Sequence, residues 1–326
     1  MAAPRSRCLM TRWSQSWKDA HELIKSLSHP KRNMKIGNWN VRSLYRSGNV
    51  AQAAREMNKR GIDIMGISET HWTGQAKVQL ASGETIIYSG REDDIQREEV
   101  GIIMSKEAYA SVIEWIPNSE RIIQARYHSR YIKLTIIHIY APTEDTDEEI
   151  KDDFYTKLQD VLDKRNARDI LIVTGDMNAK VGNQNENYER VMGKHGLGER
   201  NNNGERLCEL CDMDELVITG TLFPHKNIHK ATWVSPDGKT RNQIDHVLIS
   251  KRFRNSVRDT KVNRSADLGS DHHLVCATIK LRLRRPPGRR RDVSRVKYDT
   301  SRLGNEDVVR AFNITLRNRY QSPRGR

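Results

Sequence analysis

The feature that most constrains the fold of this chain is a series of short apolar segments of strand length. The clearest covers residues 131–140, where the stretch from Ile136 to Tyr140 is rich in β-branched side chains, as β-strands commonly are. Helical periodicity is confined to a few segments, of which residues 146–164 form the longest. Many strands with few helices predict two packed sheets covered by helices, an α/β sandwich. The expected strands cover residues 34–40, 62–68, 85–88, 100–105, 111–116, 122–127, 131–140, 169–174, 216–219, 231–234, 243–249 and 274–281.

Polar clusters follow most of these apolar segments. A single cluster has a simple structural explanation, such as an Asx turn at Asp176 to Asn178. Six clusters in the same strand-end setting predict that their side chains meet in one site, and carboxylates, amides and a histidine there indicate metal-assisted chemistry on a phosphate. The clusters are Asn38-Trp39-Asn40, Ser68-Glu69-Thr70-His71, Tyr140-Ala141-Pro142, Gly175-Asp176-Met177-Asn178, Gln243-Ile244-Asp245-His246 and Ser270-Asp271-His272.

Hydrolysis of a phosphodiester requires neutralised phosphate charge, an activated water and a stabilised leaving oxygen. Glu69 follows an apolar segment and is a candidate ligand for Mg²⁺, or alternatively Mn²⁺, because such ions bind carboxylate oxygens. Asp176 could accept a proton from water while the amide of Asn178, two residues later, holds that water. Asp245 could orient His272, and a charged His272 would stabilise the phosphate oxygens.

The net charge of +14 is concentrated at the two ends of the chain. Residues 1–33 hold seven basic and two acidic side chains, residues 282–326 hold fourteen and four, and residues 34–281 are close to neutral. Basic tails favour a polyanion through counterion release, although tails that only improve solubility have the same composition. We expect a basic N-terminal extension over 1–33, one domain over 34–281, and a basic linker over 282–326 that could hold one short helix.

No segment approaches the roughly 18 apolar residues that cross a membrane, and the basic N-terminal stretch lacks the apolar core of a secretory signal. The sequence therefore predicts a nuclear or cytoplasmic protein that is not secreted. Cys208 and Cys211 fall at helical spacing among apolar residues, which predicts buried helix thiols, with a zinc or redox pair as the minor alternative.

Taken in order, these motifs resemble the endonuclease/exonuclease/phosphatase superfamily over about residues 34–281. Within it, they are most similar to the apurinic-type endonuclease domain of non-LTR retrotransposons of the RTE kind. The resemblance implies a DNase I-like fold, a four-layered α/β sandwich of two mostly antiparallel sheets flanked by helices. The residues that carry it are Asn38 to Arg42, Ile67 to His71, Ile139 to Thr143, Gly175 to Asn178, Ile244 to His246 and Ser270 to His272.

For the metal site, the resemblance implies that Glu69 binds the ion, that Asp271 lies in its coordination shell and that Asn40 supports both the ion and the phosphate. Many relatives carry Asp or Asn two residues after the Asn40 position, where this chain has Arg42. A cation cannot be a metal ligand, so Arg42 leaves a second metal ion open and is expected to face DNA phosphates. Thr232 matches a position that touches the phosphate in related endonucleases.

For catalysis, the resemblance implies that Tyr140 contacts the scissile phosphate or its leaving group. Asp176 would activate the attacking water, which Asn178 would position. Asp245 would orient His272, and His272 would bind or polarise the phosphate.

The function expected first is a Mg²⁺-dependent endonuclease that nicks DNA and leaves 5′-phosphate and 3′-hydroxyl ends. DNA is the expected partner, a monomer is the expected state, and neither a membrane nor an organic cofactor is expected. One alternative is a phosphatase or phosphodiesterase of the same superfamily acting on a small phosphorylated substrate. Another is a catalytically silent, domesticated protein that binds DNA or chromatin through its basic tails.

Overall fold

The computed structural model describes residues 32–46, 48–91, 98–129, 131–282, 301 and 304–320. The chain divides into two compact units, Met1–Arg282 and Leu283–Arg326. The described secondary structure of the second unit includes the helix α6 (Glu306–Tyr320), where the sequence predicts one. The predicted N-terminal extension lies outside the described residues except for its last two positions, and so does much of the predicted linker.

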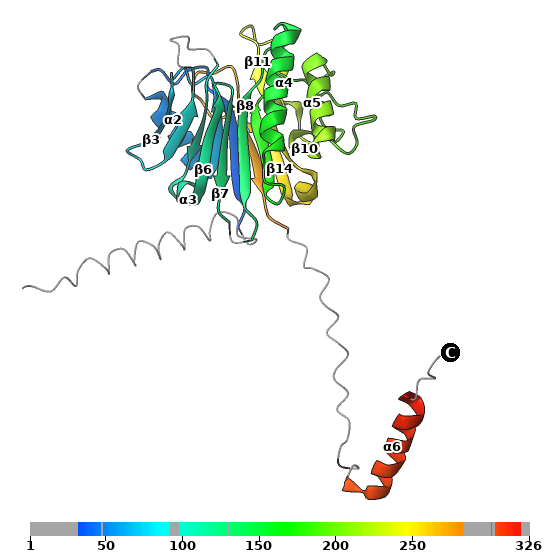
Figure 1. The fold of residues 1–326 in the computed structure, drawn as a ribbon. Coiled ribbons are helices and arrows are strands. Elements are labelled where there is room, and N and C mark those ends of the chain that lie inside the picture. The colour runs from blue at the N-terminus through cyan, green and yellow to red at the C-terminus, as the bar shows by residue number, and fades with distance from the viewer. Residues whose placement is uncertain are drawn as a thin grey trace, which may run out of the picture. The chain divides into compact units, whose positions relative to one another are not determined.

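Two β-sheets form the centre of the first unit (Figure 1). The order of the seven-stranded sheet is β14-β15-β1-β2-β5-β4-β3, and that of the six-stranded sheet is β10-β13-β9-β8-β7-β6. Neighbouring strands run antiparallel, except for the parallel pairs β1 with β2 and β8 with β9.

The strands of the seven-stranded sheet are β1 (Met34–Asn40), β2 (Ile64–Ser68), β3 (Gln75–Gln79), β4 (Thr85–Ser89), β5 (Val100–Met104), β14 (Val257–Asn263) and β15 (Leu274–Ile279). Those of the six-stranded sheet are β6 (Val112–Ser119), β7 (Ile122–Tyr127), β8 (Leu134–Tyr140), β9 (Ile170–Asp176), β10 (Leu216–Ile218) and β13 (Asp245–Ser250). A small separate sheet pairs β11 (Trp233–Val234) with β12 (Arg241–Asn242).

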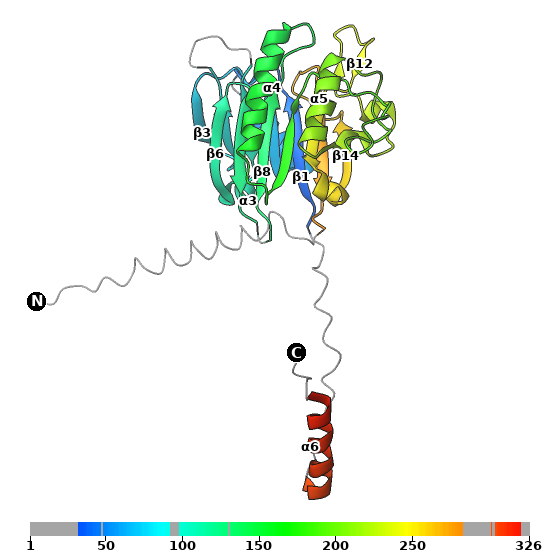
Figure 2. The same ribbon diagram turned by 45° about the vertical axis from the view of Figure 1, so that its right-hand side comes forward.

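Helices cover the outer face of each sheet, which gives four layers (Figure 2). The two inner faces share one apolar core, to which Ile36 of β1 and Ile172 of β9 belong. The helices α4 (Glu148–Asp163) and α5 (Asn202–Met213) pack on the outer face of the six-stranded sheet, and α2 (Asn49–Arg60) packs on that of the seven-stranded sheet. The predicted four-layered, DNase I-like α/β sandwich is therefore confirmed.

The remaining helices are short. They are α3 (Lys106–Ala110) and the 3₁₀ helices η1 (Thr219–Thr221), η2 (Asn227–His229) and η3 (Lys251–Ser256). None of the helices within the described ranges is both long and apolar enough to span a membrane. On α5, the thiols of Cys208 and Cys211 are free and buried, as the sequence predicts for helix thiols in an apolar core.

Strand register brings the polar strand ends together. Parallel pairing sets Asn40 beside Ser68 and Tyr140 beside Asp176. Antiparallel pairing sets Asp176 opposite Asp245. The C-terminal ends of β1, β2, β8 and β9 therefore lie together at one end of the sandwich, with the start of β13 beside them.

Buried polar groups also join the two sheets near this end of the sandwich. Asn38 Nδ2 donates to the carbonyl oxygen of Gly175 at 2.8 Å, and Ser68 Oγ lies 3.1 Å from His138 Nε2. Gly66 lies against the ring of His138, and a Cβ atom at this glycine would overlap the imidazole. The position therefore requires glycine because the facing sheet fills the space that a side chain would need.

We predict that Gly66→Ala lowers the free energy of unfolding by about 1–3 kcal/mol, as overpacking of a core commonly does. Urea unfolding of the purified protein measures the loss. His138→Ala removes the ring, so the double substitution should cost less than the sum of the two single ones, because the methyl group then has room. Additive losses would contradict the proposed contact.

His138 also predicts a pH dependence of stability. Complete burial lowers its pKa from 6.5 to about 3. Below pH 6.5 His138 is protonated in the unfolded chain but stays neutral in the folded chain. The stability that depends on neutral His138 is therefore fully present above this pH and decreases as the pH falls towards 3. At pH 5 the expected loss is about 2 kcal/mol. His138→Gln should remove about this much of the difference between urea unfolding at pH 7 and pH 5, and an unchanged difference would contradict the assignment.

Candidate active site

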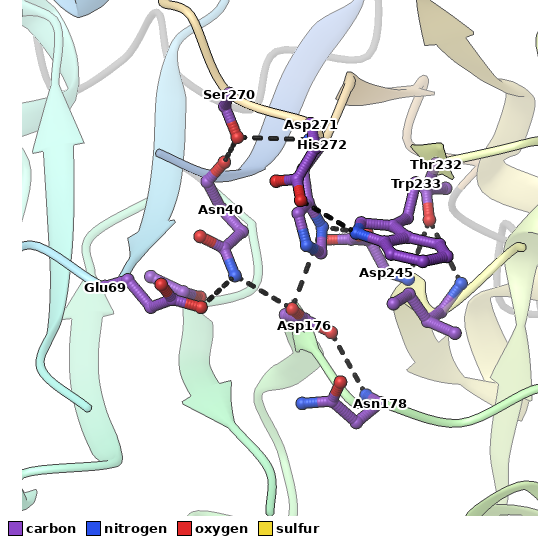
Figure 3. Close-up of polar contacts among 12 residues, drawn as sticks. Asn40, Glu69, Asp176, Asn178, Thr232, Trp233, Asp245, Ser270, Asp271 and His272 are labelled. Carbon is purple, nitrogen blue, oxygen red and sulfur yellow. Dashed lines mark hydrogen bonds and ion pairs between the residues drawn. The ribbon is translucent and has the colours of Figure 1, made fainter. Parts of the chain in front are cut away.

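The polar strand ends surround one cavity of about 620 Å³. Figure 3 shows Asn40, Glu69 and Asp176 directed towards one another, with His272 approaching Asp176 from another segment. Asn40 and two other predicted site residues are buried and do not line the cavity, namely Asp245 and Thr232. The predicted residues that line it are Arg42, Glu69, Tyr140, Asp176, Asn178, Asp271 and His272.

The amide of Asn40 joins carboxylates from both sheets. Its Nδ2 donates to Glu69 Oε1 at 2.7 Å and to Asp176 Oδ2 at 2.9 Å. Its Oδ1 accepts the backbone N–H of Arg42 at 3.0 Å. Asn40 therefore orients the two carboxylates through Nδ2, while Oδ1, which accepts this one N–H, keeps a second lone pair.

The hydroxyl of Tyr140 donates to the same Glu69 oxygen at 2.9 Å. Burial, followed by the charges of Glu69 and Asp176, raises the pKa of Tyr140. Tyr140 therefore keeps its proton and can act as a hydrogen-bond donor at neutral pH.

His272 contacts two buried carboxylates. Its Nδ1 lies 3.0 Å from Asp245 Oδ2 and 3.7 Å from Asp176 Oδ2. Burial alone would lower the pKa of His272, but Asp245 and Asp176 outweigh it and raise the pKa to about 9. Burial, followed by repulsion from Asp245, raises the pKa of Asp176, which His272 partly offsets. The three groups thus form a charged cluster in which a cationic imidazole balances part of the carboxylate charge.

Asn178 lies beside this cluster at the cavity wall. Its backbone N–H donates to Asp176 Oδ1 at 3.1 Å, and its Nδ2 donates to the carbonyl oxygen of Ala141 at 2.9 Å. This orientation leaves the amide oxygen as the acceptor that Asn178 can offer to a bound molecule.

Asp271 has two unequal oxygens. Oδ2 accepts from Trp233 Nε1 at 3.1 Å and from Arg42 Nη1 at 3.3 Å. Oδ1 is buried and has no hydrogen-bond partner. A buried carboxylate oxygen without a partner is costly, and a cation or a water molecule would satisfy it.

Thr232, for which the resemblance implies a phosphate contact, has a different setting. It is 1% exposed and does not line the cavity. Its Oγ1 accepts the backbone N–H groups of Ile244 and Asp245 at 3.0 and 3.1 Å. The geometry therefore favours a role in fixing Asp245, and through it His272, over a direct contact with a phosphate.

Backbone strain is concentrated around the cavity. Positive φ angles occur at Arg42 (56°), Glu69 (58°), His71 (59°) and Asn178 (46°). Side chains other than glycine adopt this conformation at an energetic cost, and such residues cluster at functional sites. Three of these residues, Arg42, Glu69 and Asn178, lie within two residues of the ends of β1, β2 and β9 and line the cavity.

Several residues of the site were not assigned a role by sequence reasoning. Trp233 binds Asp271, and Ser270 Oγ donates to the carbonyl oxygen of Asn40 at 2.8 Å and accepts the backbone N–H of His272 at 3.1 Å. Both residues stand next to predicted ones, which was the available signal. Two further lining residues, Thr143 and Ile244, stand within predicted motifs but were assigned no role. No sequence signal indicated the other lining residues, Glu144, Asp145, Lys180, Asn201 and Asn242.

Two places could hold a metal ion. Among the described residues, Asp176, Asp245 and His272 form a group of three whose ligand atoms lie within 4.8 Å of one another. In that group His272 Nδ1 already contacts both carboxylates, so an ion bound there would have to replace the proton on Nδ1. Glu69 and Asp271 offer carboxylate oxygens at the cavity wall, including the unpaired Asp271 Oδ1. This oxygen donor set fits a hard divalent cation such as Mg²⁺.

The sequence of this chain is similar to those of known proteins. A family model described as endonuclease-reverse transcriptase matches residues 134–276. Craniofacial development protein 2 from Bos taurus is 39% identical over 249 residues, which cover 76% of this chain and 41% of the relative. The protein of the same name from Tragulus javanicus is 38% identical over 76% of this chain and 42% of the relative. The chain thus spans about two-fifths of the length of these curated relatives.

Solved structures share the fold at lower sequence identity. The endonuclease domain of TRAS1, a telomere-specific non-LTR retrotransposon, matches with a TM-score of 0.55 and 18% identity, covering 77% of this chain and all of that one. An AP endonuclease from Archaeoglobus fulgidus matches with a TM-score of 0.57 and 16% identity, covering 76% of this chain and all of that one. At this level of identity the solved structures show a shared fold, and together with the strand-end motifs and the family model these matches support the predicted resemblance to the endonuclease/exonuclease/phosphatase superfamily.

Proposed function

We propose that this protein is a metal-dependent phosphodiesterase that nicks DNA, with Mg²⁺ as its ion. The observation that carries the proposal is the contact of His272 with Asp245 and Asp176 in a cavity that also holds Glu69 and Asn178. Burying two carboxylates and a histidine gives little stability compared with apolar side chains of similar size. Buried titratable groups with shifted pKa values in a cleft favour a catalytic role instead.

Asp176 accepts a proton from the attacking water. Burial and the nearby charge of Asp245 raise the pKa of Asp176, which makes it a stronger base than an ordinary aspartate. The amide oxygen of Asn178 accepts the other hydrogen of this water. Because the Asn178 backbone N–H is bound to the Asp176 carboxylate, the base and the positioning amide move as one unit.

His272 and Tyr140 act on the phosphate. Asp245 fixes His272 through Nδ1, so the cationic ring can present its Nε2–H to a phosphate oxygen. Tyr140 keeps its proton and can donate a hydrogen bond to the phosphate or to the leaving oxygen. His272 is held in place by Asp245 before the substrate binds, which lowers the reorganisation that the reaction requires. The Tyr140 hydroxyl is held by Glu69 and would turn its proton from Glu69 to the phosphate.

Glu69 and Asp271 are the residues that would hold the metal ion, and the Asn40 amide would keep Glu69 in position. A divalent cation bound there would act as a Lewis acid on the phosphate and neutralise part of its charge.

Two observations support DNA as the substrate. The names of the structural neighbours include endonucleases, and the family model is described as endonuclease-reverse transcriptase. The net positive charge of the chain lies outside the domain that holds the site, which suits attraction of a polyanion to a neutral catalytic body. We further propose that the protein acts on DNA as a monomer, in the nucleus or the cytoplasm.

We predict that the purified protein converts supercoiled plasmid to the nicked form in Mg²⁺ and that EDTA abolishes the reaction. Asp176→Asn should lower the rate by about 10²- to 10⁴-fold, because general base catalysis contributes this much. Asp160→Asn, at an exposed position of α4, is the matched control and should leave the rate unchanged. Intact plasmid after incubation with the unmodified protein would refute the nuclease. Hydrolysis of p-nitrophenyl phosphate without nicking would identify a phosphatase instead.

The metal site gives a separate prediction. Glu69→Gln removes one carboxylate charge but keeps the size of the side chain, so the Mg²⁺ concentration for half-maximal nicking should rise about tenfold or more. Glu149→Gln, an exposed glutamate on α4, serves as the control. Isothermal titration with Mn²⁺ measures the same loss without catalysis. Equal ion affinities of the Glu69→Gln protein and the unmodified protein would exclude Glu69 as a ligand.

A further inference from the structure

Arg42 brings a positive charge to the part of the cavity where we propose that a cation binds. Its Nη1 lies 3.3 Å from Asp271 Oδ2, and its side chain is 58% exposed. Its backbone has a φ of 56°, and its N–H is bound to Asn40 Oδ1. The backbone of Arg42 is therefore fixed at the cavity wall, whereas the guanidinium is held by a single, partly solvated contact.

Asp271 is held differently by its two donors. Trp233 reaches Oδ2 with an indole N–H from the small β11–β12 sheet, and the same strand is bridged to His272. Arg42 reaches the same oxygen from a long, exposed side chain, while Oδ1 is buried without a partner. Trp233 can therefore keep the carboxylate oriented when Arg42 leaves.

We propose that Arg42 is an exchangeable counterion of Asp271. It neutralises the carboxylate while no divalent cation is bound, and it turns to a phosphate of the substrate once the cation occupies the site. The inference rests on the proposed function, because it takes Asp271 as a ligand of the cation.

The strengths of the alternative contacts favour this exchange. An exposed ion pair with one contact at 3.3 Å is weak, so a divalent cation can replace the guanidinium on Asp271. A guanidinium left beside a divalent cation is repelled by it. The same group binds phosphate oxygens well, because its planar fork matches two of them at once. Since the backbone of Arg42 is fixed beside the cavity, its guanidinium can move only within reach of its own side chain from the cavity wall.

The exchange couples two binding events. The cation and Arg42 compete for Asp271, and Asp271 and the phosphate compete for Arg42. Each ligand therefore removes a competitor of the other, so the cation and DNA should strengthen each other's binding by the same factor. Arg42 would therefore lower the affinity for the cation in the free protein, and this affinity would rise again when substrate is bound.

The first test is isothermal titration of the full chain with Mn²⁺ in the absence of DNA. Arg42→Gln removes the competing charge, so its Mn²⁺ affinity should be about three- to tenfold higher than that of the unmodified protein. Arg46→Gln removes the same charge from an exposed position of the same loop, where the side chain has no ion pair with an acidic group among the described residues, and should stay within twofold. Equal effects of the two substitutions, or no gain from Arg42→Gln, would overturn the exchange. Both arginines are exposed, and unchanged melting temperatures would verify that both variants fold.

The second test measures DNA binding by fluorescence anisotropy on a labelled duplex. The Asp176→Asn background prevents cleavage. With Mn²⁺ present, Arg42→Gln should reduce the slope of log affinity against log salt concentration by about one, because one phosphate contact is lost. In EDTA the two slopes should agree, because Arg42 is then engaged by Asp271. A slope difference of the same size in EDTA would overturn the proposal.

These outcomes separate the inference from the proposed function. Absence of Mn²⁺ binding in every variant would overturn the cation site and the exchange together. A Mn²⁺ affinity gain in Arg42→Gln without any plasmid nicking by the unmodified protein would leave the exchange standing and refute the nuclease.

Discussion

The site depends on one buried amide, that of Asn40. Its Nδ2 binds Glu69, which follows β2 of one sheet, and Asp176, which ends β9 of the other. A buried carboxylate without a donor is expensive, so the Asn40 amide stabilises the meeting of these two strand ends by donating to both carboxylates. Asn38 lies two residues earlier on the same strand and bonds the backbone of the facing sheet. Side chains two residues apart point to the same face of a strand. β1 therefore directs Asn38 to the contact between the two sheets and Asn40 to the carboxylates of the site.

Charge balance is the second constraint. Asp176 and Asp245 face each other across a strand pair, where two like charges would repel in a dry interior. His272 reduces this repulsion by contacting both. Arg42 has the equivalent position beside Asp271, but in partial contact with solvent. The buried pairing therefore persists in the folded protein, whereas the exposed one is weak enough for the exchange proposed above.

The sequence predicted the buried strands more accurately than the exposed ones, because burial leaves a recognisable apolar pattern in the sequence. The central strands are buried on both faces and appear as continuous apolar segments, so β1, β7, β8 and β9 were predicted to within a few residues. The strands β3 and β14 were missed because neither contains a continuous apolar segment, and in β14 buried side chains are interspersed with exposed ones. Most side chains of β3 are exposed, and its pattern is that of a loop. At the site, the predicted residues meet at one end of the sandwich. Thr232, however, accepts backbone N–H groups. The contact of Trp233 with Asp271 could not be predicted, because no local sequence pattern indicates it.

By itself, the sequence determined which strands are buried, which chemical groups stand at their ends, and the family whose motifs these groups match. The tertiary structure decided which group contacts which. Arg42 and Asp271 are 229 positions apart, and Asn40 and Asp176 are 136 apart. A local pattern records whether a side chain is buried and at which strand end it lies. Only the register of the strands and the packing of the two sheets bring such distant groups within hydrogen-bonding distance, and these depend on the whole core at once.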